Sequence, residues 1–192
     1  MRKVLFFMMT SVNGFYETGP WEIDWHTVDE DFNDFALEQI DSIDTMLFGR
    51  ATYTGMANYW PTREAIESDP EVAEKMNSTP KIVFSNTLDK ADWQNSRLVK
   101  GDAAAEIRQL KQQPGRDMII FGSSELAVSL AEAGLIDEYR LMVAPVALPQ
   151  GKPVLVGLKK NLPLRMLSTR TFKNGNLLVS YGPAEGAAAG AG

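Results

Sequence analysis

Residues 118–125 have the sequence Met-Ile-Ile-Phe-Gly-Ser-Ser-Glu, in which a short apolar strand ends in a tight polar turn that opens a helix. A helix start presents unpaired backbone N–H groups and the positive end of the helix dipole, so it can bind an anion such as a phosphate. A plain strand-to-helix connection with a serine N-cap has the same pattern, and for a single motif this structural explanation is the more frequent one. The turn Gly122-Ser123-Ser124 alone therefore does not identify an anion-binding site, and the other turns of the chain decide the question.

Residues 49–53, Gly-Arg-Ala-Thr-Tyr, form a second turn of this kind between an apolar run and a helical pattern. Glycine lets the backbone approach a ligand closely, Arg50 offers a forked donor for phosphate, and Thr52 adds a hydroxyl at the helix start. A surface ion pair is the structural alternative for Arg50. Polar turns also follow two other apolar runs, at Ser11-Val12-Asn13-Gly14 and Ser85-Asn86-Thr87. Together these turns favour a groove for a nucleotide.

Apolar runs alternate with amphipathic segments along most of the chain. The runs have the length and composition of strands, several of them buried on both faces; they are Val4–Met9, Thr45–Phe48, Lys81–Phe84, Arg97–Lys100, Met118–Phe121 and Tyr139–Val143. Helical periodicity is present over Glu30–Ile40, Ala103–Gln112 and Glu125–Ala133. This alternation predicts an α/β fold with a mainly parallel sheet and a ligand at the carboxyl ends of its strands.

The C-terminal part has a different pattern. Leu164–Phe172 and Leu177–Tyr181, connected through Asn174-Gly175, predict an antiparallel hairpin at the edge of the sheet. The chain has 192 residues, of which 44% are hydrophobic, enough for one domain with a real core. We expect this domain to span residues 1–182 and the Ala/Gly-rich residues 183–192 to form a disordered tail.

Charge and composition exclude several classes of protein. A net charge of -6 argues against a nucleic-acid surface, which needs clustered Lys and Arg. The absence of cysteine and the presence of one histidine exclude disulfides, thiolate sites and multi-histidine sites, so no metal centre is expected. The apolar run Val4–Met9 is too short to span a membrane and is followed by no cleavage site. We expect a soluble cytoplasmic protein with a small-molecule ligand.

Several strong catalytic and nucleotide motifs are missing. The chain contains no G-x-G-x-x-G, no Walker A sequence and no G-x-S-x-G elbow, which disfavours a Ser-His-Asp triad built on His26. Trp21 and Trp25 lie in a Gly/Pro-bounded loop that could be a lid over a flat ring or a plug over the core.

Acidic residues gather in two regions. Asp29, Glu30 and Asp31 begin the first helix and complement its dipole, whereas Asp34 or Glu38 could face a pocket and handle a proton. The acidic residues on both sides of Pro70 are interpreted as solvated surface; they are Glu64, Glu67, Asp69, Glu71 and Glu74.

An ordered set of motifs carries a family resemblance over Lys3 to Tyr181. The motifs are Ser11-x-Asn13-Gly14, Glu22-Ile23-Asp24-Trp25, Leu47-Phe48-Gly49-Arg50-x-Thr52-Tyr53, Tyr59-Trp60, Lys81-Ile82-Val83-Phe84-Ser85, Phe121-Gly122-Ser123, Gly134-Leu135-Ile136-Asp137-Glu138 and Pro145-Val146. The chain resembles the dihydrofolate-reductase-like superfamily, and within it the branch named for the reductase domain of the riboflavin-biosynthesis deaminase-reductase.

This resemblance implies a three-layer α/β/α fold, NADPH as cofactor and a homodimer. By motif, the cofactor-binding residues would be Gly49, Arg50 and Thr52 at the phosphates, Ser85 and Asn86 at the adenosine 2′-phosphate region, and Gly122, Ser123, Ser124 and Glu125 at the pyrophosphate turn. Lys100 is a weaker candidate for a charge contact near the adenine. Ser11, Asn13, Asp24 and Trp25 would border nicotinamide and substrate, and the nearest counterparts of a pterin-binding carboxylate are Asp31 and Asp34.

The implied function is an NADPH-dependent reductase of the riboflavin-biosynthesis type. Its substrate would be a small planar heterocycle, either a pyrimidine ribosylamine such as 5-amino-6-(5-phosphoribosylamino)uracil or a pterin. Dihydrofolate reduction proper and a non-catalytic module for a nucleotide or planar ligand are the alternatives. The segment 145–153, Pro-Val-Ala-Leu-Pro-Gln-Gly-Lys-Pro, departs from the glycine-rich turn that the family often has there.

Overall fold

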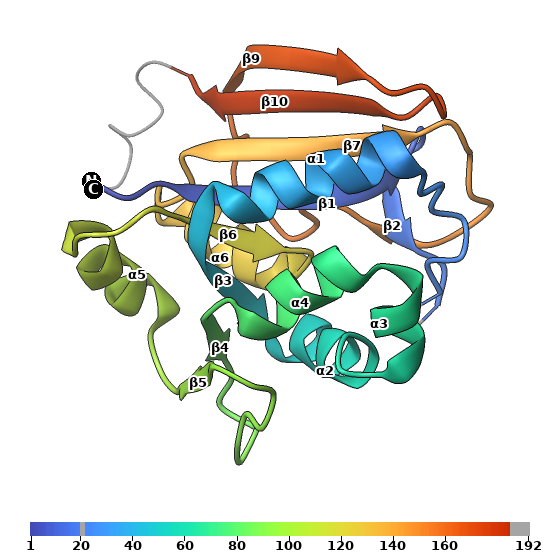
Figure 1. The fold of residues 1–192 in the computed structure, drawn as a ribbon. Helices are drawn as coiled ribbons and strands as arrows, with labels where there is room; N and C mark the ends of the chain where they lie inside the picture. Colours follow the sequence, from blue (N-terminus) through green and yellow to red (C-terminus); the bar gives the residue numbers. More distant parts are fainter. Residues whose placement is uncertain (20–21, 185–192) are drawn as a thin grey trace.

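The computed structural model describes residues 1–19 and 22–184, and in this part of the chain an eight-stranded sheet forms the centre of the molecule (Figure 1). Its strands stand in the order β5-β4-β3-β6-β1-β7-β10-β9. Their bounds are β1 (Val4–Ser11), β3 (Ile43–Gly49), β4 (Lys81–Phe84), β5 (Ser96–Val99), β6 (Asp117–Phe121), β7 (Glu138–Ala144), β9 (Leu164–Thr171) and β10 (Leu177–Pro183).

The sheet is parallel from β5 to β7 and antiparallel beyond. At its centre, Phe6 of β1 pairs with Ile120 of β6 on one side and with Tyr139 of β7 on the other. Strand β10 then runs antiparallel to β7 and to β9. The predicted parallel sheet with a C-terminal hairpin is therefore confirmed.

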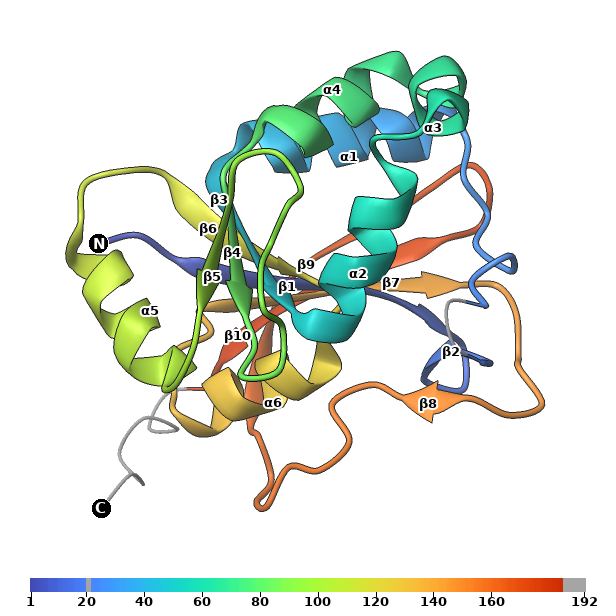
Figure 2. The same cartoon turned by 90° about the horizontal axis from the view of Figure 1, so that it is seen from below.

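Helices cover both faces of this sheet and make three layers. The helices are α1 (Glu30–Asp41), α2 (Arg50–Tyr59), α3 (Arg63–Ser68), α4 (Pro70–Ser78), α5 (Ala103–Gln112) and α6 (Ser124–Glu132). Figure 2 shows α1 and α4 on one face and α5 and α6 on the other. The predicted three-layer α/β/α arrangement is thus also confirmed.

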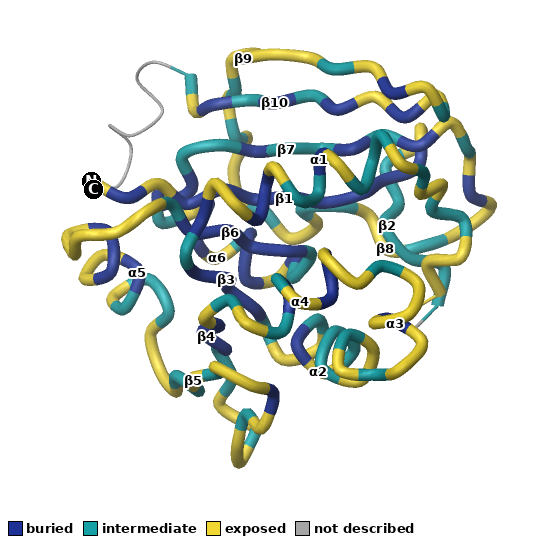
Figure 3. The backbone as a smooth tube through the Cα atoms, in the orientation of Figure 1, coloured by how far each residue is buried: buried dark blue, intermediate teal, exposed yellow. Residues whose placement is uncertain are grey.

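Strand β1 shows why the sheet is buried on both sides. Its residues alternate between two clusters: Leu5, Phe7 and Met9 pack with α1, α2 and α4, whereas Val4, Phe6 and Met8 pack with α5 and α6. Successive side chains of a strand point to opposite faces, so an uninterrupted apolar run fits a strand between two helical layers. Figure 3 shows the central strands as the buried part of the molecule.

Helix α4 lies in the acidic region around Pro70, where the glutamates are exposed as predicted and a buried face lies behind them. Asp69 caps the helix by accepting from the N–H of Val72, and Pro70 occupies its first turn. Val72, Ala73 and Met76 are buried against the sheet side, while Glu71 and Glu74 are exposed. The dense acidic residues therefore mark only the outer face of an amphipathic helix.

Residues 145–153 form part of a second, two-stranded sheet that the sequence pattern did not predict. Strand β8 (Lys152–Pro153) pairs antiparallel with β2 (Phe15–Glu17). Gly151 lies where an added Cβ would stand 2.5 Å from the carbonyl oxygen of Glu17, so only glycine fits this crossing. The unusual segment therefore closes the end of the sheet beside the polar turns.

The C-terminal boundary differs slightly from the predicted one. Strand β10 includes Pro183, and the N–H of Ala184 donates to the carbonyl oxygen of Pro163 at 3.0 Å. Pro183, the first residue of the predicted tail, therefore pairs with Leu164 of β9, and Ala184 bonds to the residue just before that strand. Residues 185–192 and Trp21 lie outside the described residues. Within the described ranges, no helix has the length and apolarity needed to cross a membrane.

Candidate functional site

A cavity of about 860 Å³ opens beside the carboxyl ends of β1, β3 and β6. Helices α1, α2 and α4 form one side of it, and the turn from β6 into α6 forms another. Tyr16, Glu17 and Lys152 of the small sheet complete its rim. A concave site of this size at the ends of parallel strands is the usual place for a cofactor and its substrate in an α/β protein.

The two turns singled out in the sequence are bonded to each other at this cavity. The N–H of Gly49 donates to the Ser123 hydroxyl at 2.9 Å, and the N–H of Ser123 donates to the Thr52 hydroxyl at 2.9 Å. Both hydroxyls are therefore used to hold the turns together, and the backbone N–H groups of the helix starts remain for a ligand.

The turn before α6 has an uncommon backbone. Gly122 has φ +59° and Ser123 has φ +50°, both in the left-handed region. A Cβ on Gly122 would lie 3.2 Å from Cγ2 of Thr52, so glycine is needed for conformation and for space. Because Ser123 bonds across to β3 and α2, it does not cap its own helix.

The starts of α2 and α6 differ from the other helix starts that the structure describes, because neither has a side-chain cap. Side chains cap α1, α3, α4 and α5 through Asp29, Thr62, Asp69 and Asp102. Arg50 begins α2, placing a cation at the positive end of the helix dipole, which is unfavourable unless an anion binds there. These two open helix starts are suited to a pyrophosphate.

Nearly all the predicted phosphate-binding residues line the cavity. They are Gly49, Arg50, Thr52, Gly122, Ser123, Ser124 and Glu125. Ser124 is buried, and its hydroxyl accepts from the N–H of Leu155 at 3.1 Å, so this side chain also has a structural partner. The side chain of Glu125 is exposed in the first turn of α6.

Ser85 and Asn86 are the exceptions, because neither lines the cavity. The Ser85 hydroxyl accepts from the N–H groups of Thr87 and Leu88 at 3.2 and 3.1 Å. Asn86 Oδ1 accepts from the N–H of Gly101 at 2.8 Å. Both residues stabilise the turn after β4, and their predicted contact with the 2′-phosphate stays a prediction.

The candidates for substrate contact are distributed unevenly. Asp24 lines the cavity and is exposed, whereas Trp25 lies next to it and packs edge to face on His26 at 4.3 Å between ring centroids. Asn13 does not line the cavity: its amide donates to the carbonyl oxygen of Leu148 at 2.8 Å and accepts from the N–H of Leu148 at 3.1 Å. Asn13 thus fastens the segment that leads to β8.

The carboxylates of α1 also lie off the cavity. Asp31 accepts from the Arg170 guanidinium at 3.0 Å, and this hydrogen bond lowers the pKa of its carboxyl. Asp34 is exposed and, like Asp31, is absent from the cavity wall. The helix presents two amides there instead, from Asn33 and Gln39. Gln39 is 3% exposed, and its position on an otherwise apolar helix face was the signal that could have identified it.

His26, which the motif search set aside as a triad base, lies at the cavity. Its Nε2 atom is buried without a hydrogen-bond partner among the described residues, as is Nε1 of Trp25. Burial lowers the pKa of His26 to about 4, with Asp24 acting weakly in the other direction. At neutral pH this histidine is therefore an uncharged part of the wall.

Tyr16, Glu17 and Lys152 form a charged cluster at the opposite rim. Lys152 makes an ion pair with Glu17, and the hydrogen bond from its ammonium group raises the pKa of the lysine. Burial, followed by the charge of Glu17, raises the pKa of Tyr16. The positive charge of Lys152 is thus already matched within the protein.

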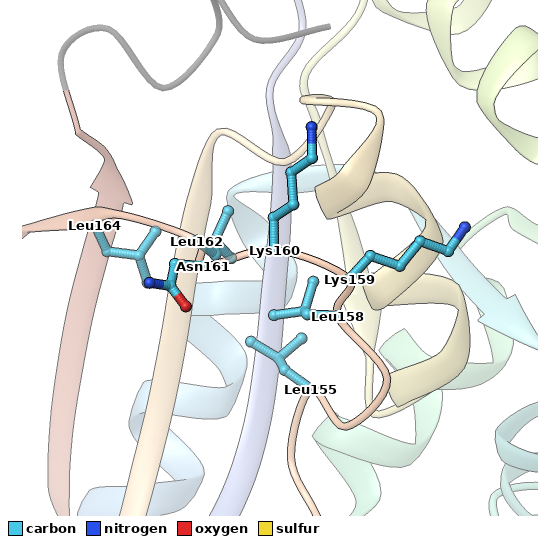
Figure 4. A pocket seen from close by; sticks show the side chains of 7 residues that line it. All are labelled: Leu155, Leu158, Lys159, Lys160, Asn161, Leu162 and Leu164. Carbon is cyan, nitrogen blue, oxygen red and sulfur yellow. The ribbon is translucent and has the colours of Figure 1, made fainter.

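Figure 4 shows a second hollow, of about 550 Å³, formed by the loop before β9 and the first residue of that strand. Its leucine side chains gather in the hollow, while Lys159 and Lys160 extend away from it. None of the predicted site residues lines this hollow. It brings together one loop rather than several polar turns, so the larger cavity is the candidate site.

Comparison with known proteins agrees with this architecture. Residues 2–178 match the family model of the RibD C-terminal domain. The uncharacterised protein YyaP of Bacillus subtilis is 32% identical over 182 residues, which cover 94% of this chain and 94% of YyaP.

Two solved structures share the fold. A proposed riboflavin biosynthesis protein from Shewanella sp. PV-4 has a TM-score of 0.73 at 20% identity, covering 95% of this chain and 99% of its own. Dihydrofolate reductase from Enterococcus faecalis, complexed with NADP(H), has a TM-score of 0.64 at 15% identity, covering 95% and 97%. The sheet order, the cavity between the open helix starts and the family match lead to one assignment: the fold is that of dihydrofolate reductase, and the chain belongs to the RibD C-terminal domain family.

Proposed function

We propose that this protein is an NADPH-dependent reductase that acts on a small planar molecule bound in the same cavity. The observation that carries the proposal is the meeting of two uncapped helix starts, α2 and α6, beside Arg50. N–H groups from both helices and the Arg50 guanidinium fit the donors that a pyrophosphate needs. The NADP(H) complex of the Enterococcus faecalis neighbour and the riboflavin-biosynthesis description of the Shewanella neighbour support the same reading.

When bound, NADPH supplies a hydride from its nicotinamide ring. The protein's own contribution is to hold the phosphates at the paired turns, to orient the two rings and to exclude water. The bonds between Gly49, Thr52 and Ser123 fix the phosphate end before any ligand arrives. Such preorganisation favours hydride transfer, because the turns that hold the phosphates need little further ordering when the cofactor binds.

Dihydrofolate reduction is the less favoured activity. Recognition of a pterin ring by charge needs a carboxylate acceptor in the cavity. The acidic residues of α1 lie elsewhere, since Asp31 is bound to Arg170 and neither Asp34 nor Glu38 lines the cavity. The carboxylates that do line it are either engaged, Asp69 as the cap of α4 and Glu17 with Lys152, or exposed, as Asp24 and Glu125 are. Efficient turnover of dihydrofolate by the purified protein would contradict this conclusion.

Cofactor titration tests the proposal. Tryptophan quenching with NADPH and with NADH is to be measured for wild type, for Arg50→Ala and for the control Arg63→Ala, whose side chain is 89% exposed on α3. We expect NADPH to bind more tightly than NADH, Arg50→Ala to weaken binding about tenfold, and the control to bind like wild type. If neither NADPH nor NADH binds to the wild-type protein, the proposal is overturned.

Two further expectations need separate measurements. Cofactor binding without substrate-dependent oxidation of NADPH, across a panel of planar acceptors, would favour a non-catalytic module. The homodimer implied by the family resemblance stays a prediction, and light scattering of the purified protein tests it.

A further inference from the structure

The part of the cavity formed by helices has an apolar lining. We call it the helical wall and define it by Phe32 and Phe35 of α1, Met56 of α2 with Trp60 at the C-terminal end of that helix, and Val72 and Met76 of α4. Phe35, Val72 and Met76 are 6%, 5% and 3% exposed. The wall belongs to the same cavity as the open helix starts, so a ligand there would lie next to a cofactor bound at the turns.

The wall offers few polar groups to a ligand. The indole N–H of Trp60 donates to the sulfur of Met56 at 3.1 Å, and the Asp69 carboxylate is used by the N–H of Val72. The remaining polar side chains that α1 contributes are the amides of Asn33 and Gln39.

The amide of Gln39 has a fixed orientation. Its Oε1 accepts from the Arg140 guanidinium at 3.3 Å, which leaves its NH₂ group as the free donor of this side chain. Arg140 itself is held by Glu138 at 2.7 Å. The wall therefore combines two amides with a large apolar surface, and the charged side chain beside it, Asp69, is negative and would repel an anion.

Positive charge is scarce around this cavity. Among the described lining residues the basic side chains are Arg50, Lys152 and His26. Arg50 stands at the start of α2, Lys152 is paired with Glu17, and His26 is neutral because burial lowers its pKa to about 4. A phosphate buried against the helical wall would lose its hydration without a cation to replace it, which is strongly unfavourable.

We propose that the helical wall binds the ring of an uncharged planar substrate, one that carries neither a phosphate nor a carboxylate, with Asn33 and Gln39 selecting its polar edge. This inference rests on the proposed reductase function and narrows it. A phosphoribosylamino group and a folate glutamate tail are both excluded from this part of the site by their charge. Specificity arises because an apolar wall without a cation rejects an anionic analogue of the same ring.

The test compares two ligands that share a ring and differ in charge. Binding of the neutral fluorophore N-phenyl-1-naphthylamine to the full chain is followed by fluorescence, with and without NADPH. It is then displaced with 2-naphthol or with 2-naphthyl phosphate. We expect 2-naphthol to compete at least tenfold better than its phosphate ester. Equal or better competition by the ester would overturn the inference.

Variants locate the binding. Ala36→Phe fills the wall and is expected to weaken fluorophore binding at least tenfold, whereas Ala105→Phe, at an exposed position of α5, is expected to leave it unchanged. Asn33→Arg adds a cation to the wall and is expected to reduce the preference for 2-naphthol over its ester. Unchanged fluorophore binding in Ala36→Phe, in protein whose circular dichroism matches wild type, would contradict the assignment to the wall.

The same samples separate this inference from the proposed function. NADPH titration of wild type reports on the cofactor site alone. Loss of NADPH binding together with a retained preference for 2-naphthol would overturn the reductase while leaving the neutral ring site intact. Normal NADPH binding with a preference for the phosphate ester would overturn the ring site while leaving the reductase intact.

Discussion

The N–H of Ser123 donates to the hydroxyl of Thr52 at 2.9 Å, across 71 positions of sequence. This bond, with its companion from Gly49 to the Ser123 hydroxyl at 2.9 Å, joins the start of α2 to the start of α6. Neither helix has a side-chain cap of its own, so the pair of bonds determines how the two sets of free N–H groups face the cavity.

Thr52→Val removes the acceptor of this bond while nearly keeping the side-chain shape. We expect a loss of about 1–3 kcal/mol in the free energy of unfolding, because the N–H of Ser123 would be left without its partner. NADPH binding should weaken about five- to tenfold as the two helix starts lose their alignment. Urea denaturation and cofactor titration check both effects, with Thr169→Val on the exposed strand β9 as the control.

Gly122→Ala places a methyl group against Thr52 and forces alanine into a left-handed conformation. We expect destabilisation of about 1–3 kcal/mol and a larger loss of cofactor affinity than in Thr52→Val, since the turn itself must change. Gly134→Ala provides the comparison: it also has positive φ, at +66°, but a Cβ there meets no atom within 4 Å. Equal effects of the two substitutions on NADPH affinity would contradict a special role for the turn.

His26 predicts a pH dependence of stability. Its pKa is about 4 in the folded protein and about 6.5 in an unfolded chain, so between these values the unfolded state binds more protons. The contribution of His26 to the free energy of unfolding should therefore be complete above about pH 6.5. It should fall by about 3 kcal/mol as the pH drops to 4.

Urea denaturation at pH 7, 5.5 and 4.5 measures this effect, and the comparison with His26→Asn isolates it from the titration of carboxyl groups. The variant should lose less stability than wild type over the same range. Parallel curves for the two proteins would show that His26 is not the group responsible.

Arg170 connects the C-terminal hairpin to α1, the helix that forms part of the cavity. Its guanidinium donates to Asp31 and Glu38 of α1 and lies 4.6 Å from the ring centroid of Phe172. Arg170→Ala should lower the free energy of unfolding by about 1 kcal/mol through the lost ion pairs and cation–π contact. Thermal unfolding checks this, with Arg165→Ala on the exposed part of the same strand as the control; equal shifts would argue against a specific link.

Local patterns in the sequence were enough to predict the sheet and the two polar turns that meet at the cavity. The apolar runs of β1 and β6 are long enough to be recognised alone, and a glycine marks each turn, followed by Arg-Ala-Thr after β3 and by Ser-Ser after β6. Helix α4 was missed because its acidic outer face conceals the spacing of Val72, Ala73 and Met76.

The helical wall could not be predicted in the same way. Phe32 and Phe35 were expected on the apolar face of α1, but an apolar face that covers the sheet and one that lines a cavity have the same periodicity. Whether Asp31 faces a ligand depends on Arg170, which lies 139 positions further along the chain. Strands β2 and β8 are similarly determined by their pairing with each other rather than by a local pattern.

The central position of β1 also affects how the protein reaches its folded state during synthesis. This strand is made before the other strands of the sheet, yet its neighbours β6 and β7 begin only at Asp117 and Glu138. Until those residues are made, an apolar segment from Val4 to Met9 has no edges to pair with, and such segments are prone to aggregation and to capture by chaperones. We therefore expect the yield of folded protein to depend more on translation rate and chaperone supply than the stability of the finished domain would suggest.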